Sequence, residues 1–225
     1  MKKEYSDKIA ENGQLIVISG PEGAGKSTVI KRYLGAHPNA MICVSATTRE
    51  KRADEEDGKD YYFLSLTEFE RMIRTGQMLE YGYFNNNAYG TPKKAVEDAR
   101  KAGKNVILDI DVVGAMKVKT LCPDATLIFI LPPSWDELEA RLVKTGYYDE
   151  KTVNTLLEIA GEEIECANLY DYVIINDDVD KAVNRFAQIV HGNKYSRNSM
   201  KSFLESYIEG EVKPKVKELS KVLND

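Results

Sequence analysis

The stretch GPEGAGKST, residues 20–28, constrains the fold of this chain more than any other feature. It follows a short apolar run, LIVIS at residues 15–19, and leads into a helical pattern at residues 26–34. A strand, a loop of the form G-x-x-x-x-G-K-[ST] and a helix, in this order, are typical of a nucleoside triphosphate-binding loop. Backbone N–H groups of such a loop and the positive end of the helix surround phosphate oxygens. The sequence therefore predicts a nucleotide site in an α/β fold.

Some residues of this loop would enclose the phosphates, and others would neutralise their charge or bind Mg²⁺. We expect Lys26 to neutralise the β- and γ-phosphates and Ser27 to hold Mg²⁺. The expected ATP-binding set comprises Gly20, Glu22, Gly23, Ala24, Gly25, Lys26, Ser27 and Thr28.

Four further apolar runs alternate with helical patterns along the chain, at residues 40–45, 105–111, 125–131 and 171–176. Continuous apolar runs suit strands that are buried on both faces, and their spacing leaves room for crossover helices. The sequence therefore predicts a doubly wound parallel sheet of five strands. Besides the first helix, we expect helices at residues 92–102, 135–144, 152–167 and 179–190.

Two carboxylates stand near the end of one of these runs, in the stretch VILDID. Asp109 and Asp111 are two residues apart, so a strand would place them on the same side. The carboxyl ends of strands border the ligand crevice in an open α/β sheet. We expect one of the two carboxylates to help hold Mg²⁺ or its waters and the other to reach the acceptor. The alternative for Asp111 is that it caps the helix that follows.

Residues 47–91 interrupt the alternation of strands and helices, which suggests a small inserted lobe. Within the polar stretch VSATTREKRADEEDGKDYYF, Arg49 and Arg52 are three residues apart and could converge on one anion. A guanidinium fork suits phosphate geometry, and Tyr61 and Tyr89 offer neutral O–H donors that could complete such a site. Taken alone, the stretch also suits a solvated, charged loop.

Composition disfavours several classes of protein. The 36 acidic and 31 basic residues give a formal net charge of −5, so no general field attracts the chain to nucleic acid or to a membrane. Cys43, Cys122 and Cys166 are scattered, which suits reduced thiols in the cytoplasm better than disulfides or a metal site. No stretch reaches 18 uncharged apolar residues, and the first 13 residues lack the apolar core of a signal peptide. We therefore expect a cytoplasmic protein without nucleic-acid or membrane partners.

Several motifs in the same order resemble the guanylate kinase family of nucleoside monophosphate kinases. The likeness runs from about residue 15 to residue 190, through VISGPEGAGKST, VSATTREKR, DGKDYYF, LEYGYF, NAYGT, LDIDVVGA, IFILPPSWDELEARL and VIINDD. The resemblance implies a P-loop kinase core, an inserted GMP-binding lobe and a short helical lid. It further implies transfer of a phosphoryl group from ATP to GMP with Mg²⁺, within purine metabolism.

The resemblance also implies the residues of the acceptor site. The implied GMP-binding set comprises Ser45, Arg49, Arg52, Tyr61, Glu80, Tyr89, Thr91 and Asp111. The two arginines and two tyrosines would hold the phosphate, while Ser45, Glu80 and Asp111 would bind guanine. Guanine presents N1–H and N2–H₂ donors to carboxylates, whereas adenine would leave a buried carboxylate facing an acceptor nitrogen. Ala88 stands where the family often has a tyrosine, so we expect weaker GMP binding.

The lid departs from the family more strongly. The resemblance implies three arginines over the transferring phosphate, and Arg141 in EARL matches the first of them. Thr145 and Leu156 stand where the other two are expected. A cation at such a transition state contributes about 10³-fold or more in rate, so we expect a slow enzyme. The implied catalytic set is Lys26, Arg49, Asp109 and Arg141.

Several explanations of this departure are open. Lys144 or Lys151 could supply the charge, or a partner subunit could insert an arginine. The chain could instead be a non-catalytic, guanylate kinase-like interaction module that binds nucleotides, or a related kinase with a different acceptor.

The expected organisation has four parts. A flexible N-terminus covers residues 1–13, and the kinase core covers residues 14–46 and 92–191, with a lid at about 144–153. The GMP-binding lobe covers residues 47–91, and a C-terminal helical extension covers residues 192–225. Apolar residues at helical spacing on both sides of Gly210 predict a helical hairpin, which would pack on its own core or form a dimer contact. The expected partners are the substrates ATP and GMP, and the chain would be a monomer or a homodimer.

Overall fold

The computed structural model describes residues 12–194, together with 196, 204, 205 and 209. Its centre is a five-stranded sheet in the order β2-β7-β1-β8-β9, and every neighbouring pair is parallel. These strands are β1 (Leu15–Ser19), β2 (Ala40–Ile42), β7 (Asn105–Asp109), β8 (Thr126–Leu131) and β9 (Tyr172–Ile175). The predicted parallel sheet is therefore confirmed.

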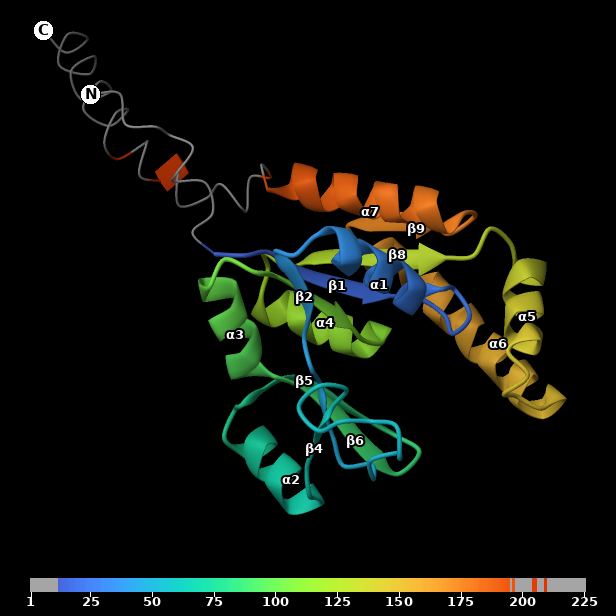
Figure 1. The fold of residues 1–225 in the computed structure, drawn as a ribbon, viewed down its shortest axis with the longest axis horizontal. Helices are drawn as coiled ribbons and strands as arrows, with labels where there is room; N and C mark the ends of the chain where they lie inside the picture. Colours follow the sequence, from blue (N-terminus) through green and yellow to red (C-terminus); the bar gives the residue numbers. More distant parts are fainter. Residues whose placement is uncertain (1–11, 195, 197–203, 206–208, 210–225) are drawn as a thin grey trace, which may run out of the picture.

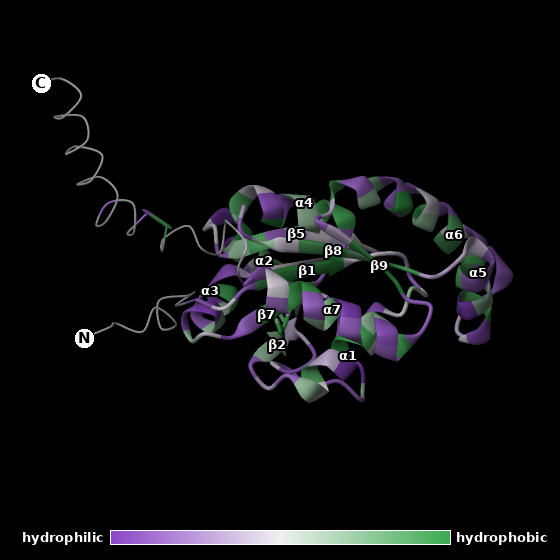
Figure 2. Cartoon of the chain, turned by 90° about the horizontal axis from the view of Figure 1, so that it is seen from above, coloured by the Kyte–Doolittle hydropathy of each residue, from purple (hydrophilic) through white to green (hydrophobic). Residues whose placement is uncertain are grey.

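Helices cover both faces of this sheet (Figures 1 and 2). On one face α1 (Lys26–Ala36) and α7 (Val179–Asn193) pack against Ile16, Ile128 and their neighbours. On the other face α3 (Lys93–Lys101) and α4 (Val112–Leu121) enclose a second apolar cluster. Burial on both faces explains why the central strands are almost wholly apolar in sequence.

A second sheet lies apart from the first, in the order β4-β3-β6-β5, and carries α2 (Figure 1). Its elements are β3 (Ala46–Thr47), β4 (Tyr62–Phe63), α2 (Leu66–Arg74), β5 (Met78–Phe84) and β6 (Asn87–Pro92). Phe69 of α2 is fully buried against Ala46, Met78 and Ala88. Ala88 thus packs in a hydrophobic core, whereas Tyr89 points to the opposite side of the strand. The expectation that Ala88 weakens GMP binding stays a prediction.

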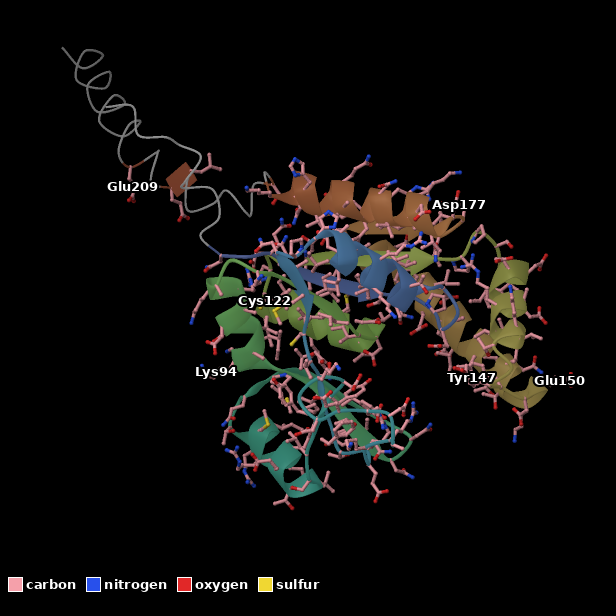
Figure 3. All side chains as sticks on the ribbon, viewed as in Figure 1. Lys94, Cys122, Tyr147, Glu150, Asp177 and Glu209 are labelled. Carbon is pink, nitrogen blue, oxygen red and sulfur yellow. The ribbon has the colours of Figure 1, made fainter. Side chains whose placement is uncertain are left out.

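Two helices, α5 (Trp135–Lys144) and α6 (Glu150–Glu165), project from the carboxyl-end side of the sheet (Figure 1). Figure 3 places Tyr147 and Glu150 where these helices join, away from the sheet. The side chains of Ser134 and Asp149 cap the two helices by accepting bonds from backbone N–H groups. A short 3-10 helix, Cys166–Leu169, then leads into β9.

Some sequence-based boundaries were wrong. The strand expected at residues 40–45 ends at Ile42, and the α6 helix begins two residues earlier than expected. Helices α2 and α4 were not predicted, since α4 follows its strand with only two intervening residues and contains Gly114. The proposed C-terminal hairpin lies almost entirely outside the described residues. Among the helices that the structure does describe, none is both long enough and apolar enough to cross a membrane.

Candidate functional site

The loop after β1 has a backbone that only glycine adopts easily. Gly20, Gly23 and Gly25 have φ values of 141°, 85° and 86°. A Cβ on Gly20 would lie 2.1 Å from the carbonyl oxygen of Ile130, and one on Gly25 would lie 2.4 Å from Asn176 Nδ2. The glycines therefore allow the loop to curl tightly in front of α1, as a phosphate-binding loop requires.

Polar contacts hold this loop in place. Lys26 Nζ donates to the carbonyl oxygens of Gly20 at 2.6 Å and Pro21 at 3.0 Å, so its ammonium group lies across the loop. Asn176, which is 2% exposed at the end of β9, donates from Nδ2 to the carbonyl of Ala24 at 2.8 Å. This bond connects the loop to the end of β9, the edge strand of the sheet.

A cavity of about 550 Å³ lies between this loop, the end of β7 and the projecting helices. Its volume is within the usual range for small-molecule sites. The lining side chains and loop residues are Gly20, Glu22, Gly23, Gly25, Lys26, Ser27, Thr28, Asp109, Ile110, Asp111, Arg141, Thr145, Leu156, Ile159 and Glu163. Most of the predicted ATP-binding residues therefore border one cavity.

The two aspartates occupy different environments. Asp109 is the last residue of β7, and burial raises the pKa of its carboxyl group, while the charge of Lys26 opposes that rise. Asp111 lies beyond the strand, where its Oδ1 accepts from Gly114 N at 2.7 Å and caps α4. The expectation that both belong to one strand was wrong, and the capping interpretation of Asp111 is confirmed.

Asp111 nevertheless lies beside Glu80 of β5. A Cβ on Gly114 would lie 3.0 Å from Glu80 Oε2 and 3.3 Å from Asp111 Oδ1, so the two carboxylates flank this glycine. Thr91 donates its hydroxyl to Glu80 Oε1 at 2.6 Å. Burial raises the pKa of Glu80, and the charge of Asp111 adds to the rise, which Thr91 opposes. Ser45 precedes β3, and its carbonyl accepts from Tyr62 N at 2.8 Å.

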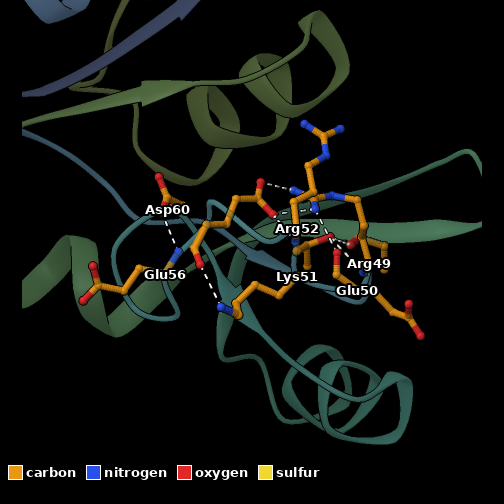
Figure 4. Close-up of polar contacts among 9 residues, drawn as sticks. Arg49, Glu50, Lys51, Arg52, Glu56 and Asp60 are labelled. Atoms are coloured by element: carbon orange, nitrogen blue, oxygen red, sulfur yellow. Dashed lines mark hydrogen bonds and ion pairs between the residues drawn. The ribbon is translucent and has the colours of Figure 1, made fainter.

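The structure gathers the four expected phosphate ligands in the second sheet. The guanidinium carbon of Arg49 lies 5.3 Å from the centroid of the Tyr61 ring, and this ring lies 6.2 Å from that of Tyr89. Arg49 Nη1 and Nη2 each donate to Glu55 at 2.7 Å. The backbone N–H of Arg52 donates to the same carboxylate at 2.8 Å (Figure 4). The carboxylate of Glu55 therefore accepts from the Arg49 guanidinium and from the backbone of Arg52, and the expected convergence of two guanidinium groups on one phosphate stays a prediction.

Arg141 of α5 borders the cavity from the lid side. Its Nη2 donates to the carbonyl of Asn176 at 3.0 Å, and its Nε donates to Glu137 Oε1 at 2.8 Å. These bonds fix the guanidinium group beside the phosphate-binding loop. The helix itself contacts the loop, because a Cβ on Gly23 would lie 3.1 Å from Leu138 Cδ1.

The two positions where arginines were expected also border the cavity. Thr145 donates its hydroxyl to the carbonyl of Leu142 at 2.8 Å, and Leu156 packs on the apolar cluster between α5 and α6. Lys144 and Lys151 are both exposed, and neither lines the cavity. Of the described residues that line it, Lys26 and Arg141 carry positive charge.

Sequence reasoning missed three polar residues of the site, Glu55, Asn176 and Glu163. Glu163 lies two turns after Leu156 on α6, a spacing that puts both on one helix face. Burial raises the pKa of its carboxyl group, which borders the cavity. The helical spacing could have identified Glu163, whereas a buried asparagine at a strand end and one glutamate in an acidic loop give no local signal.

Comparison with known proteins places this geometry in a family. The guanylate kinase family model matches residues 12–193. The guanylate kinase of Desulfitobacterium hafniense is 45% identical over 183 residues, which is 81% of this chain and 92% of that protein. The guanylate kinase of Lactococcus lactis is 45% identical over 185 residues, covering 82% and 90% of the two chains.

A solved structure of a guanylate kinase is also similar to this chain. The crystal structure of guanylate kinase from Anaplasma phagocytophilum has a TM-score of 0.70 and 33% sequence identity, and it covers 88% of this chain and 96% of its own. With the loop, the parallel sheet and the two-carboxylate pair already described, these matches lead to one conclusion: the chain belongs to the guanylate kinase family.

Proposed function

We propose that this protein transfers the γ-phosphoryl group of ATP to GMP, giving ADP and GDP. One observation carries the proposal: a single cavity is lined both by the phosphate-binding loop and by Asp111, which lies beside Glu80. A donor nucleotide on the loop and an acceptor nucleotide on the carboxylate pair would therefore share that cavity. The name of its close relatives, guanylate kinase, favours a kinase over a binding module.

The acceptor base would be selected by charge. Glu80 and Asp111 would accept from the N1–H and N2–H₂ groups of guanine, and Ser45 would donate to O6. Thr91 would orient Glu80 through the bond that it already donates to Oε1. Adenine in the same place would leave a partly buried carboxylate facing an acceptor nitrogen, which is costly. The acceptor phosphate would bind in the cluster of Arg49, Arg52, Tyr61 and Tyr89.

The protein's part in the transfer is positioning and electrostatics. Phosphoryl transfer needs the two substrates in line and positive groups where charge accumulates on the transferring phosphate. Backbone N–H groups of the loop and Lys26 would hold the β- and γ-phosphates. Arg141, held by Asn176 and Glu137, would supply the cation on the lid side. We expect a slow reaction because Thr145 and Leu156 add no charge at the two other lid positions.

The residues at the loop suit Mg²⁺. The hydroxyl of Ser27 and the carboxylate of Asp109 are hard oxygen donors that line the same cavity. The described residues hold no cluster of three or more potential metal-binding side chains. Mg²⁺ bound through one or two protein oxygens and the substrate phosphates needs no such cluster. When bound there, Mg²⁺ would neutralise charge on the β- and γ-phosphates.

A coupled assay tests the reaction. ADP formation is measured with ATP, Mg²⁺ and each of GMP, AMP, CMP and UMP, and we expect turnover with GMP far above that with the other three. Calorimetry measures GMP binding in parallel. GMP that binds without supporting ADP formation would contradict the kinase proposal and favour a nucleotide-binding interaction module. Roles in purine metabolism and in the cytoplasm stay predictions.

A further inference from the structure

The expected phosphate site includes Arg49 and Arg52, which lie in the loop between β3 and β4. A carboxylate of the protein itself, that of Glu55, binds in this site. Glu55 Oε2 and Oε1 accept from Arg49 Nη1 and Nη2, each at 2.7 Å. Oε2 also accepts from Arg52 N at 2.8 Å. Two parallel N–H bonds to one carboxylate are the strongest arrangement that a guanidinium group makes with an anion.

The pair is enclosed rather than displayed on the surface. The side chains of Arg49 and Glu55 are 17% and 13% exposed. The Arg49 guanidinium lies 5.3 Å and 5.6 Å from the ring centroids of Tyr61 and Phe63. Lys51 Nζ donates to the carbonyl oxygen of Glu55 at 2.8 Å and ties down its backbone (Figure 4). The loop is therefore built to present this carboxylate to Arg49.

We propose that Glu55 is an internal counter-anion that occupies the acceptor phosphate position, so that GMP must displace it from the Nη1–Nη2 edge of Arg49. The inference rests on the proposed GMP site and concerns what sets its affinity. A phosphate that binds this edge with two bonds needs the same two N–H groups that Glu55 accepts from. Part of the binding free energy of the phosphate is therefore used to break the Arg49–Glu55 pair. Glu55 thereby raises KM for GMP.

The exchange depends on the charge of the incoming phosphate. Hydrogen bonds from Arg49 and Arg52 hold the pKa of Glu55 at about 2, so Glu55 keeps its full charge above pH 4. A phosphate monoester has its second pKa near 6, so it carries about two charges above that pH and about one below it. A dianion displaces a carboxylate more readily than a monoanion does. KM for GMP should therefore rise as pH falls through about 6.

The charged and titratable groups around Glu55 come from its own loop and from the neighbouring aromatic residue Tyr61. Arg49 donates to both carboxylate oxygens, the backbone N–H of Arg52 donates to Oε2, Lys51 donates to the backbone carbonyl, and the charge of Glu55 acts on Tyr61. The bond from Glu55 raises the pKa of Arg49, and burial raises the pKa of Tyr61, so both groups titrate further above the range from pH 5 to pH 8. A change in KM over this range that depends on residue 55 therefore reports the exchange.

The Glu55→Gln variant tests the inference. Glutamine keeps the size of the side chain and removes its charge, so we expect KM for GMP to fall about tenfold, the scale of one hydrogen bond to a charged group. We expect kcat and KM for ATP to change less than about twofold. The rise of KM below about pH 6 should also become shallower. Glu56→Gln is the matched control, because Glu56 is an exposed carboxylate one residue away that pairs with Lys59 instead.

Several outcomes would overturn the inference. A higher KM for GMP in Glu55→Gln would mean that Glu55 orients Arg49 while phosphate uses another edge of the fork. An equal fall in KM for GMP in Glu56→Gln would mean that any loss of negative charge in this loop has the same effect. Should Glu55→Gln fold poorly, Glu55→Asp keeps the charge but shortens the reach, and an unchanged KM in that variant contradicts displacement. Absence of GMP turnover in the unmodified protein would contradict the proposed function instead, and calorimetry with GMP would then decide on Glu55.

Discussion

The phosphate-binding loop and the lid border the same cavity but are built in opposite ways. The loop combines three glycines with positive φ and a lysine across its carbonyls, and it faces the partly buried Asp109 at the end of β7. The expected lid, at about residues 144–153, joins two capped helices, α5 and α6, that are held together by Leu138, Leu142, Val153, Leu157 and Ala160. Arg141 is the lid cation that lines the cavity among the described residues.

The two regions differ in whether their residues serve ligand binding or the stability of the fold. Beside the loop, burial of the Asp109 carboxylate costs stability, and the proposed ligand site accounts for that cost. In the lid, Thr145 donates to its own helix and Leu156 packs against its neighbours, so both residues contribute to stability. Substrate binding should therefore depend steeply on the loop and weakly on the lid, and four experiments test this contrast.

The largest expected effect compares two lysines on the two sides of the cavity. Lys26→Ala should lower kcat/KM by about 10³-fold or more, because it removes a cation from the transferring phosphate. Lys144→Ala should lower it less than about threefold, since Lys144 is exposed and does not line the cavity. Steady-state kinetics with ATP and GMP measure both. A large loss in Lys144→Ala would show that the lid supplies its cation from that lysine.

A second pair of variants compares glycines with similar backbone geometry. Gly25→Ala should reduce the free energy of unfolding by about 2–4 kcal/mol, since it adds left-handed strain and a contact with Asn176. Gly146→Ala, at a φ of 68° in open space, should cost only about 1 kcal/mol. Chemical denaturation measures both values. Equal costs would mean that Asn176 moves aside freely.

Restoring charge to the lid should give a smaller effect. Thr145→Arg should raise kcat about tenfold, because position 145 lines the cavity and an arginine there can reach the transferring phosphate. The control is Thr155→Arg, which adds the same charge on an exposed part of α6. KM for GMP should change little in either variant. No gain in Thr145→Arg, or an equal gain in the control, would contradict a missing lid cation.

The smallest expected effect concerns Asp109. Because burial raises its pKa in the folded state, the folded protein binds more protons than the unfolded chain between the two pKa values. The contribution of Asp109 to stability is therefore lost as pH rises from about 4 through the raised pKa. Asp109→Asn should raise Tm at pH 7 by roughly 2–4 °C, the shift that about 1 kcal/mol gives a chain of this size.

Melting curves from pH 4 to pH 7 check this sign. The fall in stability with rising pH should become shallower in Asp109→Asn but should persist in part, because Glu80 and Glu163 also have raised pKa values. The same substitution should reduce activity, since Asp109 is proposed to help hold Mg²⁺. A lower Tm in Asp109→Asn would mean that its attraction to Lys26 outweighs the cost of burial.

Much of the site was predictable because its signals are local. The loop could be identified from glycine spacing and its flanking strand, since backbone geometry depends on a few neighbouring residues. Arg141, Thr145 and Leu156 were identified through the resemblance to the guanylate kinase family rather than through a local pattern. By contrast, the strand assignment of Asp111 failed because its cap on Gly114 competes with strand extension.

The sequence by itself determined the class of fold and the phosphate-binding loop, because apolar periodicity and glycine placement act over short stretches of chain. The family followed from the resemblance of several motifs in order. Only the tertiary structure decided which polar groups meet across long separations. Asn176 reaches Ala24 across 152 positions, and Glu80 lies beside Asp111. The order of the strands in the two sheets brings these groups together, and no local sequence pattern encodes the resulting distances.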